Sequence, residues 1–159
     1  MGMPTTLEEL KTLTDQLIQS DDALKRSEER FRRLFEESGV CMAVFDLPTA
    51  KFNHVNKALC AATGYAEEEL VSHNVLNFVD EAHRMSIDDR IERLRSNPGP
   101  YYETVKVLYT KKNGDPIWLN WHYFRDSHEP ILYCVAIDVT RETVLEERVK
   151  ELERLMAQQ

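Results

Sequence analysis

The sequence predicts an α+β domain flanked by two amphipathic helices. In the central part, residues 39–140, two short strands are followed by several short helices and then by three longer strands. The dipeptide Asn113-Gly114 joins two of the longer strands and is typical of an antiparallel hairpin with a two-residue turn. Apolar residues recur at heptad spacing in residues 1–38 and 141–159, which indicates helices outside the domain.

The composition argues against several classes of partner. The chain has 159 residues with 20 Lys and Arg against 28 Asp and Glu, and the net charge of −8 disfavours nucleic acid and anionic lipid. Cys41, Cys60 and Cys134 lie in apolar contexts without a Cys-x-x-Cys pair, so we expect buried thiols in a reducing cytoplasm. No apolar run approaches the roughly 18 residues of a membrane span, and no signal peptide is evident. We therefore expect a cytoplasmic module without a membrane segment, cut from a longer protein because its last helical pattern is still running at Gln159.

The first element is a helix predicted to run to residue 38. Thr6 and Glu9 form a capping-box pattern after Pro4. One apolar row repeats every seven residues and the second row contains two serines, which favours a coiled coil with a weak middle over an amphipathic helix lying on its own domain. We expect Gly39 to end the helix as a left-handed cap. The predicted dimer seam consists of Leu10, Leu17, Leu24 and Phe31.

Two short strands and a set of short helices are predicted next. Asn56 is a good N-cap and Gly64 a good left-handed stop, so a helix should lie between them. Three glutamates at 67–69 suit the start of another helix, and the Pro- and Gly-rich run at 97–100 ends a third. The expected elements are strands at 40–47 and 51–55, helices at 57–63, from 66 and at 88–96, and one or two helical turns within 74–83.

Three antiparallel strands are predicted at 101–111, 117–124 and 131–137, with a turn at 126–130 between the last two. Alternation gives each strand one face toward the helices and one face away from them. The outward stripe is apolar, so we expect it to be covered by Phe31, Leu34 and Phe35 of the first helix, by a second subunit, or by both. The outward residues are Trp118, His122, Phe124, Ile131, Tyr133, Val135, Ile137 and Val139.

The last strand runs into the C-terminal helix without a flexible linker. We expect Thr140 to be the N-cap of this helix, in the joint formed by residues 138–141. Such a joint passes a displacement of the strand to the helix, so Asp138, Thr140 and Arg141 are the predicted relay residues. The helix carries a second heptad seam, which predicts pairing with a second copy of the chain. This seam consists of Leu145, Val149, Leu152 and Met156.

Several short motifs resemble the signature of the Per–Arnt–Sim (PAS) sensory domains. They are the run 52–59, Thr63-Gly64-Tyr65, Glu68-Glu69-Leu70, Lys112-Asn113-Gly114 followed by Trp118, and Asp138-Val139-Thr140, in the family's order and over about residues 28 to 145. The resemblance implies a five-stranded antiparallel sheet with short helices on one face and a small cavity. It also implies signal input upstream of histidine kinases, nucleotide cyclases or transcription factors, with flanking helices that pair in a parallel homodimer.

The resemblance makes flavin and haem poor candidates for a cofactor. The flavin-binding branch of the family uses a cysteine where this chain has Val75, and valine cannot form the flavin adduct. The haem-binding branch uses an axial histidine where this chain has Ile87; His83 lies one helical turn earlier. The five histidines, at 54, 73, 83, 122 and 128, lack metal-ligand spacing, so we expect no metal. A small apolar ligand is the remaining candidate.

A cavity and a filled core share one sequence pattern, and both interpretations stay open here. Trp121, Tyr109 or Tyr123 would give a bound molecule one polar contact. We expect no enzyme, because the chain lacks a phosphate-binding glycine loop, a nucleophile elbow and an HExxH motif. The predicted function is an input module that relays a small-molecule or redox signal; the alternative is a ligand-free module that dimerises and spaces its neighbours. The candidate cavity lining is Ala43, Phe45, Ile91, Leu94, Val107, Tyr109, Leu119, Trp121, Tyr123, Leu132, Cys134 and Ala136.

Overall fold

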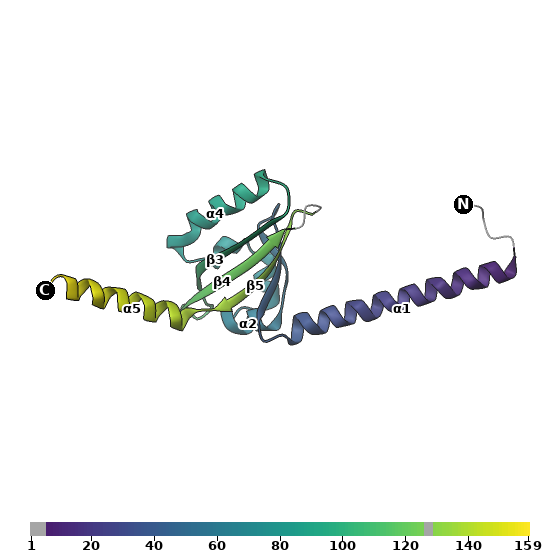
Figure 1. Cartoon of the computed structure of the whole chain (residues 1–159), viewed down its shortest axis with the longest axis horizontal. Coiled ribbons are helices and arrows are strands. Elements are labelled where there is room, and N and C mark those ends of the chain that lie inside the picture. The colour runs from purple at the N-terminus through teal and green to yellow at the C-terminus, as the bar shows by residue number, and fades with distance from the viewer. Residues whose placement is uncertain (1–5, 126–128) are drawn as a thin grey trace. The chain divides into compact units, whose positions relative to one another are not determined.

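The computed structural model describes residues 6–125 and 129–159, and the chain forms two compact units, Met1–Ser38 and Gly39–Gln159 (Figure 1). Part of the turn predicted at 126–130, including His128, and Pro4 lie outside the described residues. Among the described residues, no helix combines the length and the apolar character that a membrane span requires.

The first unit is a single long helix, α1 (Leu7–Glu37). The capping box is present: the Thr6 hydroxyl accepts from the Glu9 amide at 3.2 Å, and the Glu9 carboxylate accepts from the Thr6 amide at 3.2 Å. The predicted left-handed cap at Gly39 is wrong, because the helix ends at Ser38 with extended backbone, φ −66° and ψ 135°. Gly39 and Val40 form a bend before the strand that starts at Cys41, and Gly39 does not adopt the positive φ of a left-handed cap. All four seam residues of α1 are exposed.

The second unit is built on one five-stranded antiparallel sheet, which confirms the predicted α+β class. The strand order is β2-β1-β5-β4-β3, so β5 lies at the centre and β3 at one edge (Figure 1). The turn between β3 and β4 is longer than the predicted two residues, because Thr110 pairs with Pro116, and Gly114 adopts φ +92° within it. The strands are β1 (Cys41–Asp46), β2 (Lys51–Val55), β3 (Tyr101–Thr110), β4 (Pro116–Arg125) and β5 (Ile131–Asp138).

Five helical segments accompany the sheet. Asn56 caps α2 as predicted, with its buried side chain accepting from the Leu59 amide at 3.1 Å, and Gly64 ends the helix at φ +80°. The long helix α4 begins at Glu81, not at residue 88, because Asp80 caps it through the Ala82 amide at 3.1 Å. The helical segments are α2 (Lys57–Thr63), α3 (Glu67–Ser72), the 3₁₀ turn η1 (Val75–Asn77), α4 (Glu81–Ser96) and α5 (Thr140–Ala157).

The core lies between the helices and one face of the sheet. The inward residues predicted by alternation are buried, apart from the half-buried Val105. Helical side chains close the core from the other side, including Leu59, Leu70, Ile91 and Leu94. On the opposite face Phe124 stacks on Tyr133 with ring centroids 5.1 Å apart, and this face remains partly exposed within the unit.

Candidate functional site

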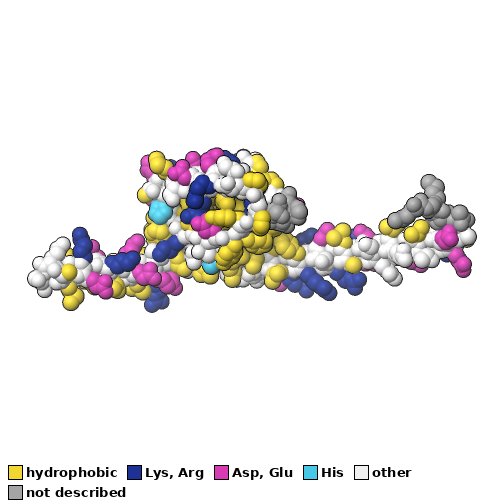
Figure 2. Space-filling view, turned by 45° about the horizontal axis from the view of Figure 1, so that its top comes forward, with side chains coloured by type: hydrophobic (Ala, Val, Ile, Leu, Met, Phe, Trp, Pro, Cys, Tyr) yellow, Lys and Arg dark blue, Asp and Glu magenta, His cyan; other side chains and the backbone are white. Residues whose placement is uncertain are grey.

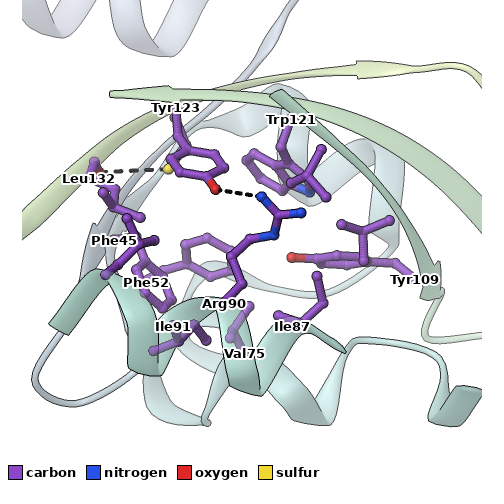
Figure 3. Close-up of a pocket in the computed structure, with 14 residues that line it drawn as sticks. Phe45, Phe52, Val75, Ile87, Arg90, Ile91, Tyr109, Trp121, Tyr123 and Leu132 are labelled. Carbon is purple, nitrogen blue, oxygen red and sulfur yellow. Dashed lines mark hydrogen bonds between the residues drawn. The ribbon is translucent and has the colours of Figure 1, made fainter. Parts of the chain in front are cut away.

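An apolar cavity of about 70 Å³ lies between α4 and the inner face of the sheet (Figure 3). Its walls come from strands β1 to β5, from η1 and from α4, so all five strands contribute to it. Figure 2 shows a hollow in the body, with hydrophobic atoms inside it and basic and acidic atoms beside it. The predicted residues that the structure places in the lining are Phe45, Ile91, Leu94, Val107, Tyr109, Trp121, Tyr123, Leu132 and Cys134.

Three predicted lining residues, Ala43, Leu119 and Ala136, are buried in the core but do not line the cavity. Alternation along a strand gives the face on which a side chain lies. It does not show which part of that face borders the cavity. Ala43, Leu119 and Ala136 fill core positions beside the cavity.

Five lining residues were missing from the predicted cavity lining: Phe52, Val75, Ile87, Arg90 and Val105, of which Val105 had been predicted to face inward. Val75 and Ile87 hold the positions that the family resemblance linked to flavin and haem, and both present apolar side chains to the cavity. The match of Val75 and Ile87 to these family positions could have identified both as cavity-lining residues. His83 is not among the lining residues, and its ring instead meets the ring of Trp118 edge-on at 5.3 Å.

A polar cluster stands at one side of the cavity, on α4, β3 and β4. Arg90 forms an ion pair with Glu103, and it donates to the Tyr123 hydroxyl at 3.1 Å. The Tyr123 hydroxyl donates to the second Glu103 oxygen at 2.9 Å, and the Tyr101 hydroxyl donates to that oxygen as well. The side chains of Arg90 and Glu103 are 20% and 28% exposed, so the pair lies where the cavity meets solvent.

Hydrogen bonds keep the Glu103 carboxylate charged. Partial burial acts to raise its pKa, but the bonds from Tyr101, Arg90 and Tyr123 outweigh burial and lower the pKa to about 2. Arg90 and Glu103 therefore form a neutral pair at any ordinary pH. Burial raises the pKa of Tyr123, so its hydroxyl keeps its proton.

The Cys134 thiol and the Tyr109 hydroxyl inside the cavity are neutral, so Arg90 is the charged residue of the lining. Burial raises the pKa of the Cys134 thiol to about 12, and burial likewise raises the pKa of Tyr109. Two N–H groups in the lining, Nε1 of Trp121 and Nε of Arg90, have no hydrogen-bond partner among the described residues. Trp121 is the more deeply buried of the two residues, at 5% exposed.

The joint between β5 and α5 is held by side chains, but in a different way from the prediction. Thr140 is the first residue of α5 and not its N-cap; Val139 occupies the cap position without a capping side chain. The Thr140 hydroxyl instead accepts from the Trp118 amide at 2.9 Å and donates to Asp138 Oδ1 at 2.5 Å. The same carboxylate oxygen accepts from the Thr140 amide at 3.0 Å. Arg141 is exposed beside this joint.

Helix α5 touches the sheet only near its start. Thr143 is its one buried residue, and its amide donates to the Val139 carbonyl at 2.9 Å. Glu146 lies 3.9 Å from Lys106 of β3, and the Lys106 ammonium stands over the Trp118 ring at 5.6 Å. The seam residues Leu145, Val149, Leu152 and Met156 are exposed.

Comparison with known proteins gives consistent matches. The family model for the PAS domain matches residues 38–141. A methyl sulfide methyltransferase-associated sensor from Methanosarcina acetivorans is 22% identical over 125 residues, which are 77% of this chain and only 12% of that protein.

Solved structures share the fold at low sequence identity. The PAS domain of an HTR-like protein from Haloarcula marismortui matches with a TM-score of 0.64 and 20% identity, over 76% of this chain and 98% of the other. The PAS domain of the RpfR quorum-sensing receptor from Cronobacter turicensis, in complex with C12:0, matches with a TM-score of 0.55 and 18% identity, over 65% and 96% of the two chains.

Proposed function

Because this chain belongs to the PAS domain family, whose members are typically sensory and not catalytic, we propose that it is the input module of a signal-transduction protein. In this proposal the cavity binds a small molecule and the chain forms a parallel homodimer. The paired α5 helices pass a change in occupancy to a fused output domain of the kinase or nucleotide cyclase class. Cys41, Cys60 and Cys134 form no disulfide among the described residues, which suits the reducing cytoplasm as the location of the protein.

The observation that carries the proposal is that β4 serves both the cavity and the joint. Trp121 lines the cavity, and Trp118, three residues earlier on the same strand, bonds through its amide to Thr140. The Trp118 carbonyl also accepts from the Val139 amide at 2.9 Å. Three residues of strand span about 10 Å, so a displacement of the cavity wall reaches the start of α5 through one rigid element.

The relay works by shifting a population between two arrangements of the joint. A ligand that holds Trp121 in one position favours one position of β4. The hydrogen bonds that join Thr140 to Trp118 and to Asp138 then fix the direction in which α5 leaves the sheet. In the dimer, a change of that direction rotates or splays the paired helices, and the output domain responds to their arrangement.

The proposed dimer rests on two exposed apolar seams. On α1 the seam repeats every seven residues, and on α5 it alternates spacings of four and three residues. A seam of only two heptads is short for an independent coiled coil, so the proposed dimer needs the seams of both helices.

A ligand-free dimerisation and spacing module is the second candidate, and the size of the cavity favours it. About 70 Å³ is half the volume of an engineered cavity of about 150 Å³ that binds benzene. A cavity of this size admits only a small molecule unless its walls move.

Native mass spectrometry of the purified protein, followed by thermal-shift measurements, separates these candidates. The sensor proposal expects a dimer that retains or acquires a small molecule. Cys134→Leu fills part of the cavity and should abolish that binding, whereas Cys60→Leu, outside the lining, should not. A dimer that never carries a ligand, and whose stability no small molecule alters, would support the spacing module.

A further inference from the structure

We propose, on the basis of the sensory function above, that the cavity selects a small uncharged molecule with one hydrogen-bond acceptor, such as a short ketone or ester. The acceptor oxygen is held by the indole N–H of Trp121 and the Nε–H of Arg90. The rest of the molecule lies against the apolar walls.

The unpaired donors define the polar end of the ligand. Trp121 Nε1 and Arg90 Nε are both buried, both belong to cavity-lining residues, and both lack a partner among the described residues. In Figure 3 the Arg90 side chain rises from α4 and carries its guanidinium toward Trp121 and Tyr123. A buried N–H group without a partner is costly, and an acceptor on the ligand removes that cost. Since both groups can only donate, the ligand must accept.

The charge balance of the site excludes an anionic ligand. Glu103 neutralises Arg90, and the hydrogen bonds from Arg90, Tyr123 and Tyr101 hold the carboxylate in place. A ligand carboxylate would either have to displace Glu103 or bring an unbalanced negative charge next to it in an apolar site. A cation finds no free carboxylate inside the cavity, because Glu103 is occupied. A neutral acceptor meets neither penalty.

The cavity volume limits the apolar part. When scaled to the cavity of about 150 Å³ that holds the six carbon atoms of benzene, a space of about 70 Å³ accommodates a compact molecule of about three to four non-hydrogen atoms. Water is the competing occupant, but it would find two donors and almost wholly apolar walls, whereas buried waters usually make about three hydrogen bonds. The Tyr109 hydroxyl is the competing acceptor for the indole: its ring centroid lies 6.0 Å from that of Trp121, and an interaction with the Trp121 N–H acts to lower the Tyr109 pKa, although burial outweighs it.

The test uses matched probes on the whole chain labelled with ¹⁵N at the indoles of its two tryptophans, assigned with Trp118→Phe. The probes are acetone, the isosteric alkene isobutene, and acetate. We expect acetone to shift the Trp121 indole signal saturably, and the alkene and acetate to bind at least about tenfold more weakly. Trp121→Phe should weaken acetone binding by about fivefold to tenfold and leave alkene binding unchanged. Tyr109→Phe should retain the indole shift.

Each contrary result has a distinct meaning. Equal binding of ketone and alkene, or tighter binding of acetate, overturns the inference while leaving a ligand-binding cavity. If no probe moves the Trp121 indole signal and its proton exchanges with water, the site holds only an ordered water. That result also overturns the inference. If the Tyr109→Phe variant loses the indole shift, the Tyr109 hydroxyl is the group that holds the probe. That result would overturn the assignment of Trp121 and Arg90 as the donors. A different result would contradict the sensory proposal: native mass spectra in which the protein neither retains a ligand nor binds an added one.

Discussion

Replacing Thr140 by valine should loosen the joint between β5 and α5 without disturbing the core. The substitution keeps the branched shape of the side chain and removes the hydroxyl. That hydroxyl accepts from the Trp118 amide at 2.9 Å and donates to Asp138 at 2.5 Å. The half-buried Trp118 N–H therefore loses its acceptor, and Asp138 loses one of its two bonds to Thr140.

The expected cost follows from those two bonds. An unsatisfied, half-buried N–H together with a lost hydroxyl–carboxylate bond should lower the free energy of unfolding by about 1–2 kcal/mol. Asp138→Ala removes an exposed acceptor near the start of α5 and should cost about 1 kcal/mol, as a lost helix cap does. Because the two residues share a bond, the double variant should lose less than the sum of the two effects, by roughly 0.5 kcal/mol or more.

Urea unfolding measures these losses, and amide hydrogen exchange locates them at Trp118 and the first turn of α5. Thr140→Ser keeps the hydroxyl and should lie within about 0.5 kcal/mol of the unmodified protein. Glu146→Ala, on the same helix, removes only a long, exposed ion pair and should have a similarly small effect. If Thr140→Val has the same free energy of unfolding as Thr140→Ser and the Trp118 amide exchanges no faster, the joint does not stabilise the start of α5. The proposed relay through β4 would then be wrong.

Three further predictions concern the polar cluster, a thiol and the seam. The pKa of Glu103 lies near 2 in the folded chain against 4.5 ordinarily, so its stabilising effect is present above pH 4.5 and lost as the pH falls toward 2. The stability gap between the protein and Glu103→Gln should therefore narrow over that interval in acid titrations of unfolding; a constant gap would contradict this. Iodoacetamide should label Cys134 only after unfolding, because burial raises its pKa to about 12, while half-buried Cys60 reacts earlier; simultaneous labelling would refute it. Val149→Asp should lower the dimer fraction in sedimentation equilibrium and Glu147→Ala, off the seam, should not; equal effects would remove the seam from the interface.

The inner face of the sheet was predictable from the sequence because strand geometry has a period of two. Ala43 pairs with Cys134 and Phe45 with Leu132, and all four side chains are buried on the same face. Alternation alone gives this result, whatever the order of the strands. The predicted fold class rested on the same regularity, together with the turn residues between the strands.

The predictions of helix ends that were wrong concern positions where the path of the chain matters. A local sequence pattern does not determine that path. Gly39 was expected to be the left-handed cap of α1, but the backbone at Ser38, where the helix ends, is extended and Gly39 has no positive φ. The first turns of α4 carry almost no apolar periodicity, so the helix was predicted to start at residue 88. Only the Asp80 cap marks the true start, and aspartate is too common in loops to identify a cap by itself.

The chemistry of the cavity was the least predictable part, because it depends on an ion pair between distant elements. Arg90 stands in a helix rich in charge, with Asp89 and Glu92 close by in sequence, yet its partner is Glu103 on the edge strand. Had Arg90 paired within its own helix, Glu103 would lack its cation, and with Arg90 turned outward the cavity would lose one donor. The placement of α4 over β3 therefore decides both the net charge of the site and the number of its free donors. A sequence pattern gives the apolar walls of such a cavity, but the class of ligand that it accepts follows from that single tertiary contact.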